Sequence, residues 1–154
     1  MKYLVIAFSL VSAIAYAGTQ SVPATVLNPS VTPSTLSSTV CVAGYTSKIR
    51  PSTSYTNGVK LKLLKKKGLD KTSMPAYELD HLVALSIGGA PKNTSNLVLQ
   101  PWDGVGGAKA KDVLEKKLQC LVCSGQVPLA TAQSAMYFDW QTAAKKYRPM
   151  KCTR

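Results

Sequence analysis

Four cysteines constrain the fold of this chain more than any other feature of its sequence. They are Cys41, Cys120, Cys123 and Cys152. An even number of cysteines in a small exported chain predicts a framework of disulfide bonds. In a cytosolic chain the same residues favour a metal site or a catalytic thiol. The choice therefore depends on whether the chain leaves the cytoplasm.

The first 17 residues have the order of a secretory signal sequence. Lys2 supplies a positive charge, residues 3–14 are mostly apolar, and Ala15-Tyr16-Ala17 offers small residues for cleavage. The apolar run is shorter than the roughly 20 residues that a membrane-spanning helix needs. We therefore expect a signal peptide over residues 1–17 and a secreted or periplasmic protein without stable membrane insertion.

Two disulfides are then expected, and four cysteines allow three pairings. We favour Cys41 with Cys123 and Cys120 with Cys152, because this pairing ties both ends of the domain to one helix. A redox-active dithiol at Cys120 and Cys123 is an alternative, but such a CxxC usually begins a helix, and this one ends a predicted helix. Zinc is disfavoured because the chain has a single histidine and no second close pair of cysteines.

Positive charge is the second strong feature. The 154 residues include 19 Lys and Arg against 7 Asp and Glu, which gives a formal net charge of +12 at pH 7. This excess predicts a polyanionic partner, either nucleic acid or an anionic envelope surface. A hydrophobic content of 45% supports one globular domain of ordinary size.

The hydrophobic pattern predicts an α+β domain over residues 41–154. Residues 18–40 carry no charge, three prolines and many Ser and Thr, so we interpret them as a flexible tether; an added edge strand is the alternative. The expected elements are a helix at 57–67 capped by Thr56, strands at 77–85 and 96–99, and helices at 108–122 and 129–147.

Lysines are concentrated on the first of these helices. The run includes Lys60, Lys62, Lys65, Lys66 and Lys67. A solvated helix face is the ordinary explanation of such a run. The same lysines can also follow a phosphate backbone, where each contact adds affinity without reading the sequence.

Acid–base chemistry converges on His81, the only histidine, which follows Asp80 in a polar interruption of an apolar segment. Successive residues of a strand point to opposite faces, so both side chains reach one site only if the strand end bends. Asn96 follows, just before the apolar residues 97–99. A buried histidine that bonds to a backbone carbonyl is the structural alternative to a catalytic one.

The sequence resembles the HNH endonucleases over ELDHLVALSIGGAPKNTSNLVLQPWDG at residues 78–104 and AKAKDVLEKKL at residues 108–118. More narrowly, it is similar to small secreted or phage-borne HNH-like proteins that share a CVxGYT start and a VCSG segment, here at residues 41–46 and 122–125. The resemblance implies a disulfide-stabilised ββα-metal core, in which a hairpin and a helix hold one divalent cation, with additional helices.

By this resemblance His81 is the general base, Asp80 is a metal ligand, and Asn96 holds the loop that orients the histidine. A histidine with an ordinary pKa near 6.5 suits the deprotonation of water. One carboxylate can anchor Mg²⁺, or Mn²⁺, when water and phosphate oxygens complete the shell. The expected cofactor is therefore one divalent ion.

The start of the following helix departs from the family. The last family ligand, His or Asn, aligns with Gly107, or with Lys109 if the alignment is shifted by two residues, and neither binds a metal well. Lys111 and Asp112 match the family's Lys-Asp pair. We expect Lys111 and Lys109 to contact phosphates, Asp112 or Glu115 to supply the missing ligand, and Gly107→Asn to restore one.

The leading hypothesis is an exported, metal-dependent endonuclease with little sequence preference, which acts as a monomer and prefers DNA to RNA. The alternative is a basic nucleic-acid-binding module of the same fold with a degraded metal site. A cysteine hydrolase that uses His81 and a free thiol is a third hypothesis. Whether an immunity protein is a partner stays open.

Overall fold

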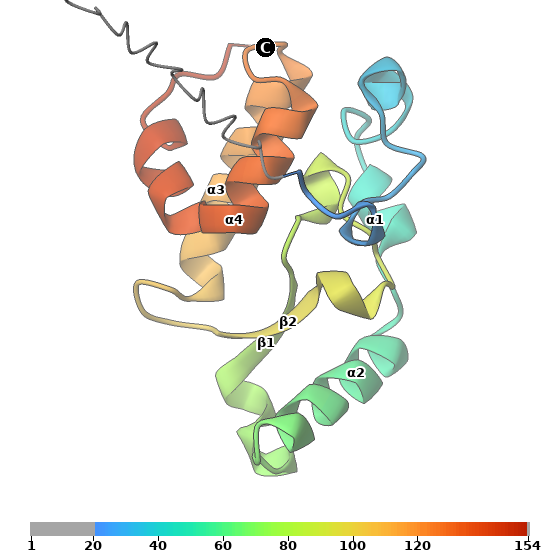
Figure 1. Ribbon diagram of the computed structural model, residues 1–154, viewed down its shortest axis with the longest axis vertical. Helices are drawn as coiled ribbons and strands as arrows, with labels where there is room; N and C mark the ends of the chain where they lie inside the picture. Colours follow the sequence, from blue (N-terminus) through green and yellow to red (C-terminus); the bar gives the residue numbers. More distant parts are fainter. Residues whose placement is uncertain (1–20, 154) are drawn as a thin grey trace, which may run out of the picture.

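A small antiparallel sheet separates two groups of helices (Figure 1). The computed structural model describes residues 21–153, so the predicted signal sequence lies outside the described residues. The helices and strands are α1 (Tyr45–Ile49), α2 (Thr53–Lys66), β1 (Tyr77–His81), β2 (Leu97–Pro101), α3 (Ala108–Cys123) and α4 (Leu129–Tyr147). The predicted α+β class is confirmed. Within residues 21–153, none of the helices has both the length and the apolar character needed to cross a membrane.

The strands β1 and β2 pair in an antiparallel register that joins Tyr77 to Pro101 and His81 to Leu97. We expected β1 to continue to Leu85, but it ends at His81. The residues that follow form a short 3-10 turn, η4 (Leu85–Ile87), which buries Leu85 and Ile87 in the core. The hydrophobicity that indicated a longer strand therefore belongs to this turn.

The helix α2 begins four residues earlier than predicted. Its N-cap is Ser52, whose hydroxyl oxygen accepts a hydrogen bond from the backbone N–H of Tyr55. Thr56 lies inside the helix and bonds to the carbonyl of Thr53 instead. The predicted stop is confirmed, because Gly68 adopts a left-handed φ of +71° directly after the last turn.

The core lies between α3 and α4, which pack side by side (Figure 1). Leu114, Leu118 and Leu121 of α3 are fully buried, and they face Ala132 and Met136 of α4 in one cluster. The helical spacing of these residues predicted both helices correctly. α4 contains a kink at Asp139, whose carboxylate accepts the N–H of Thr142 and so caps the second half of the helix.

Residues 21–40 correct the prediction of a flexible tether. Val26, Val31 and Val40 are buried in the core, and the backbone of residues 26–28 bonds to Gly88 and Ala90. The prediction failed because this segment folds into irregular turns, whose backbone groups bond to one another, to the loop at Gly88 and to threonine hydroxyl groups. In the turn η2 (Pro33–Ser38), Thr35 and Thr39 donate to carbonyls, which requires no periodic pattern.

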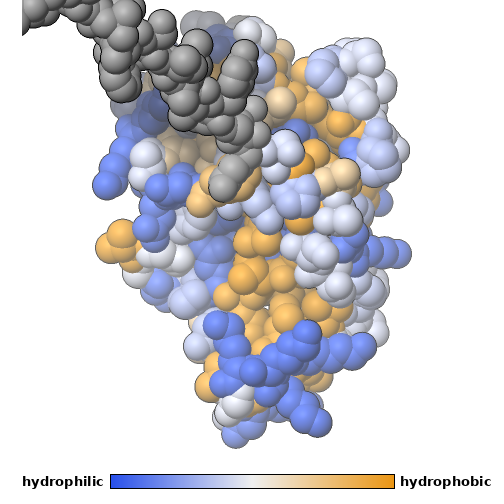
Figure 2. Space-filling view, in the orientation of Figure 1, coloured by the Kyte–Doolittle hydropathy of each residue, from blue (hydrophilic) through white to orange (hydrophobic). Residues whose placement is uncertain are grey.

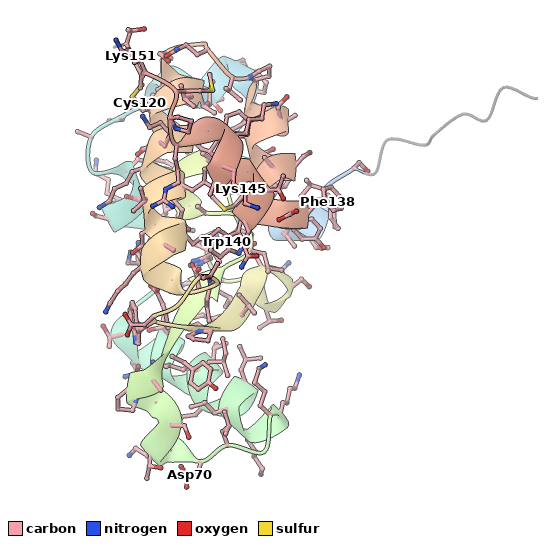
Figure 3. The ribbon with its side chains drawn as sticks, turned by 90° about the vertical axis from the view of Figure 1, so that its left-hand side faces the viewer. Asp70, Cys120, Phe138, Trp140, Lys145 and Lys151 are labelled. Atoms are coloured by element: carbon pink, nitrogen blue, oxygen red, sulfur yellow. A yellow bond between two sulfur atoms is a disulfide. The ribbon has the colours of Figure 1, made fainter. Side chains whose placement is uncertain are left out.

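The disulfides join Cys41 to Cys123 and Cys120 to Cys152, so the favoured pairing is confirmed. No cysteine among the described residues is free, which contradicts both the redox dithiol and the thiol hydrolase. Figure 3 shows Cys120 near one end of the molecule and Asp70 near the other. Two disulfides indicate that the protein folds in an oxidising environment.

We expect the denatured, unreduced protein to contain no titratable thiol. Replacing both Cys41 and Cys123 by Ser should lower the free energy of unfolding more than replacing Cys120 and Cys152, since the bonds span 82 and 32 residues. The loop-entropy model gives about 4.5 and about 3.7 kcal/mol. Urea unfolding of the two double variants measures the difference, and a larger loss for the shorter loop would contradict this ordering.

Candidate functional site

His81 lies at the end of β1 and is 7% exposed. Its Nε2 atom is 3.2 Å from the carbonyl oxygen of Pro91. A carbonyl oxygen only accepts hydrogen bonds, so neutral His81 carries its proton on Nε2 and keeps a lone pair on Nδ1. The ring is therefore held in the tautomer in which Nδ1 can accept a proton.

The pKa of His81 is lowered from its ordinary value, chiefly because burial removes water from the ring. The positive charges of Arg50 and Lys111 act in the same direction. The carbonyl of Pro91 and the carboxylate of Asp80 oppose this shift without reversing it. His81 is therefore neutral at pH 7, which is the protonation state that a general base requires.

Asn96 is fully buried and connects the two sides of the loop between β1 and β2. Its Oδ1 accepts the N–H of Val83 at 2.8 Å, and its Nδ2 donates to the carbonyls of Val83 and Ala90 at 3.0 and 3.1 Å. Ala90 immediately precedes Pro91, the partner of the imidazole. Asn96 therefore holds the segment that fixes the tautomer of His81.

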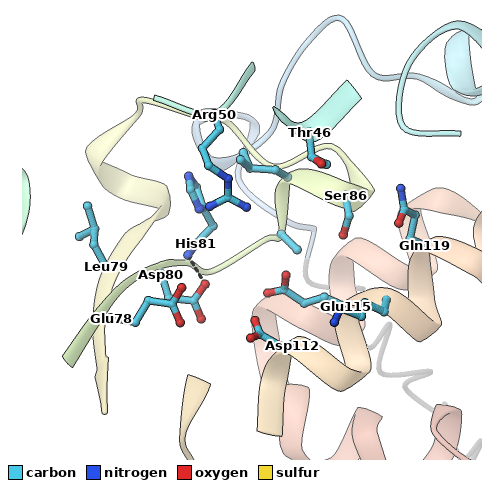
Figure 4. A pocket seen from close by; sticks show the side chains of 13 residues that line it. Thr46, Arg50, Glu78, Leu79, Asp80, His81, Ser86, Asp112, Glu115 and Gln119 are labelled. Carbon is cyan, nitrogen blue, oxygen red and sulfur yellow. Dashed lines mark hydrogen bonds between the residues drawn. The ribbon is translucent and has the colours of Figure 1, made fainter. Parts of the chain in front are cut away.

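Asp80 is buried beside His81, and both of its carboxylate oxygens have partners. Oδ1 accepts the backbone N–H of His81 at 2.6 Å, which Figure 4 shows as a dashed line, and Oδ2 accepts from Lys111 Nζ at 2.9 Å. The bend at the end of β1 thus places Asp80 against the backbone of His81. In this arrangement Asp80 forms a buried ion pair with Lys111.

The position of Lys111 differs from the prediction that it contacts a phosphate. Its side chain is 2% exposed, and Nζ donates to Asp80 Oδ2, to the carbonyl of His81 at 2.7 Å and to Glu115 Oε1 at 2.8 Å. Burial acts to lower the pKa of Lys111, but Glu115 and Asp80 outweigh it and raise this pKa above its ordinary value. The lysine is charged, internal and fully partnered, so it does not reach a bound phosphate.

A cavity of about 370 Å³ opens beside His81 (Figure 4). Arg50 and His81 lie on one side of this view, and a group of acidic side chains lies on the other. The acidic residues are Glu78, Asp80, Asp112 and Glu115. The cavity thus combines a neutral imidazole and a guanidinium with a carboxylate-rich wall.

Two further cavities share lining residues with this one. Arg50 and His81 also line a cavity of about 230 Å³ that extends to Lys60 of α2 and to Trp102. A third cavity, of about 330 Å³, shares two lining residues with the first and reaches the Cys41–Cys123 disulfide. Because the second and third cavities each share lining residues with the first, we refer to the three together as the His81 groove.

Glu78 was quoted in the motif but given no role from the sequence. One of its carboxylate oxygens, Oε2, is buried without a hydrogen-bond partner. Burial raises the pKa of Glu78 to about 7, and the negative charges of Asp80, Asp112 and Glu115 contribute. Its position two residues before Asp80 could have identified it, because residues i and i+2 of a strand share a face. Half of the Glu78 side chains are therefore protonated near neutral pH.

Arg50 was missed because it follows the short helix α1, which has no clear hydrophobic period. Its contribution to the pKa of His81 shows that the two side chains are close enough to interact electrostatically. Arg50 is exposed, and both cavities beside His81 include it in their lining. It is therefore a cation of the site that an anion in the groove can reach.

The predicted metal ligands do not fit a metal ion as they are arranged. In the part of the chain that the structure describes, no three His, Cys, Asp or Glu side chains converge in a geometry that could hold one. Asp80 is occupied by Lys111 and by the His81 backbone. Asp112 lines the acidic wall of the same cavity as Asp80, but no third such side chain joins them in a metal-binding geometry among the described residues.

Gly107 has no room for the ligand that we expected a substitution to restore. A Cβ atom at Gly107 would lie 2.6 Å from the backbone carbon of Asp103 and 2.8 Å from the carbonyl oxygen of Trp102. Contacts this short with backbone atoms require the loop before α3 to move. The expectation that Gly107→Asn completes a metal site is therefore wrong.

The predicted phosphate-binding lysines separate into three groups. Lys60 lines the groove, whereas Lys65, Lys66 and Lys67 are exposed at the last turn of α2 and its cap. Figure 2 shows hydrophilic side chains gathered at this end of the molecule. Lys109 is exposed and already forms an ion pair of 2.7 Å with Asp103. The structure thus brings Lys60 alone of these lysines to His81.

Comparison of the chain with models of protein families, with curated proteins and with solved structures finds no match. The function must therefore be inferred from the site itself.

We expect the stability of the wild type to fall, relative to Glu78→Gln, as the pH rises from about 4.5 to about 7. The pKa of Glu78 is about 7 in the folded state and near its ordinary 4.5 in the unfolded state. The folded state therefore binds the proton more tightly, and this stabilisation is lost as the proton leaves. Thermal unfolding of both proteins across this pH range measures the effect; parallel curves would contradict the assignment.

We expect Gly107→Asn to destabilise the protein by about 1 to 3 kcal/mol, the usual cost of overpacking. Gly106→Asn is the matched control, because a Cβ there approaches only the side-chain amide of Gln141, at 3.0 Å. Urea unfolding compares the two variants. Unchanged stability together with tighter divalent-metal binding in Gly107→Asn would contradict the structure.

Proposed function

We propose that the chain is an endonuclease that hydrolyses nucleic-acid phosphodiester bonds with His81 as general base. The observation that carries the proposal is the neutral, buried imidazole, which is fixed through Nε2 on the Pro91 carbonyl and lies in a groove beside Arg50. The order of β1, β2 and α3 supports a ββα core of the kind that the HNH resemblance implies. We therefore assign the site to hydrolysis.

The residues of the groove suit the steps of phosphodiester hydrolysis. Nδ1 of His81 takes a proton from water while the water oxygen attacks phosphorus. Arg50 can contact the non-bridging oxygens, where its guanidinium stabilises the charge that develops in the transition state. The bond to the leaving oxygen then breaks, solvent protonates that oxygen, and the imidazolium returns its proton to water.

The groove and the charge support a polymeric anionic substrate. The three cavities that share lining residues offer more surface than a single phosphate needs, which supports a substrate longer than one nucleotide. Lys60 and Trp102 on one side offer a phosphate contact and an aromatic ring for stacking. With 19 basic residues and no evident base-reading element, we propose a sequence-tolerant enzyme that prefers DNA to RNA and acts outside the cytoplasm.

The second candidate is a basic module that binds nucleic acid without cleaving it. The carboxylate-rich wall and the internal position of Lys111 favour this candidate, since both keep a phosphate away from the imidazole while the exposed lysines at the end of α2 can still bind a strand. The two candidates agree on binding and differ on hydrolysis.

We expect His81→Ala to reduce cleavage by about 10²- to 10⁴-fold, the usual contribution of a general base, and to leave binding nearly unchanged. Plasmid and RNA cleavage, each measured with Mg²⁺, with Mn²⁺ and with a chelator, reports activity; fluorescence anisotropy reports affinity. Added imidazole should partly rescue the variant. Lys60→Ala is the contrasting variant, in which binding should weaken. Equal cleavage by the wild type and His81→Ala would sink the proposal, and binding without cleavage by the wild type would establish the binding module.

A further inference from the structure

The ammonium group of Lys111 has the surroundings of a bound cation. Nζ lies 2.9 Å from Asp80 Oδ2, 2.8 Å from Glu115 Oε1 and 2.7 Å from the carbonyl oxygen of His81. Two carboxylates and a carbonyl are the oxygen donors that hard cations prefer. The lysine side chain is 2% exposed, whereas Asp80 and Glu115 also line the cavity beside His81.

The three oxygens come from two elements that the ammonium joins. Asp80 and His81 belong to β1, and Glu115 lies one turn beyond Lys111 on α3. Asp80 is oriented independently of the lysine, because its other oxygen accepts the N–H of His81. The donors would therefore keep part of their arrangement without the ammonium group.

We infer that Lys111 is the resident cation of this site and takes the place that the HNH resemblance gives to a divalent ion on Asp80. The ammonium holds Asp80 and the His81 carbonyl in position, so Lys111 is a positioning residue for the imidazole. Removing the ammonium therefore leaves an oxygen shell of two carboxyl groups and a carbonyl, which are the donors that hard divalent cations take.

This inference concerns the same site as the proposed endonuclease but does not rest on catalysis. Its readouts are metal binding and thermal stability, so it can fail or hold whether or not the protein cleaves nucleic acid.

The test compares the full chain with Lys111→Ala and Lys116→Ala after treatment with a chelator and dialysis. Electron paramagnetic resonance measures bound Mn²⁺, and thermal unfolding is recorded with and without millimolar MnCl₂. Lys116 is the matched control because it lines the same cavity and is exposed, so its removal changes the charge equally without opening the shell.

We expect the wild type and Lys116→Ala to bind no Mn²⁺ at Asp80 and to unfold at the same temperature with and without MnCl₂. Lys111→Ala should unfold at a lower temperature, bind one Mn²⁺ and recover part of the lost stability when the metal is added. Adding Asp80→Asn to Lys111→Ala should abolish this recovery.

Two results would overturn the inference. One is that the wild type binds one Mn²⁺ and that the Asp80→Asn variant does not. The metal would then occupy the shell together with the ammonium, which the inference excludes. The other is a folded Lys111→Ala that binds no Mn²⁺. If Lys111→Ala does not fold without metal, refolding in MnCl₂ decides: folding that depends on Mn²⁺ supports the inference, and failure under both conditions counts against it.

Discussion

The buried ammonium of Lys111 joins the two elements on which the candidate site depends. Moving a charge out of water costs several kcal/mol, and an ion pair recovers this cost only when its remaining hydrogen-bonding groups are satisfied. Lysine has three N–H donors, and here Asp80, Glu115 and the His81 carbonyl accept one each. All three N–H donors of the ammonium therefore have acceptors, so Lys111 can be buried without an unsatisfied hydrogen-bonding group.

The position of this ammonium is fixed from the opposite end of α3. Cys120 and Cys123 tie the last turns of α3 to Cys152 and Cys41, and the leucines between them and Lys111 pack against α4. Nine residues separate Lys111 from Cys120, which is about 14 Å along a helix. A rigid helix therefore transmits the constraint of the disulfides to β1. The same helix that completes the core also sets the distance between Asp80 and Glu115.

The sequence was sufficient to predict an element where one strong local signal determines it. The spacing of the leucines in α3, the start of α4 after Pro128 and the four cysteines are such signals, and the corresponding helices and disulfides were predicted closely. Residues 21–40 were not, because Val26, Val31 and Val40 are buried by an irregular chain that threonine hydroxyl groups stabilise. At the site, His81 and Asn96 could be identified by type. The ion pair between Lys111 and Asp80 could not, since partners 31 residues apart in the sequence leave no local signal.

The charge of the whole molecule and the charge of the groove act over different distances. A net charge of +12 favours the approach of a polyanion to the surface as a whole, an effect that salt screens over a Debye length of about 8 Å, whereas carboxylates at the site act at contact. Glu78, Asp112 and Glu115 repel a phosphate from one wall of the cavity, and Arg50 attracts it to the other. If a nucleic-acid strand binds in the groove, as we propose, its phosphate would lie on the side of Arg50 and His81. The acidic wall would then orient the backbone relative to the imidazole without any contact to a base, as the proposed sequence-tolerant enzyme requires.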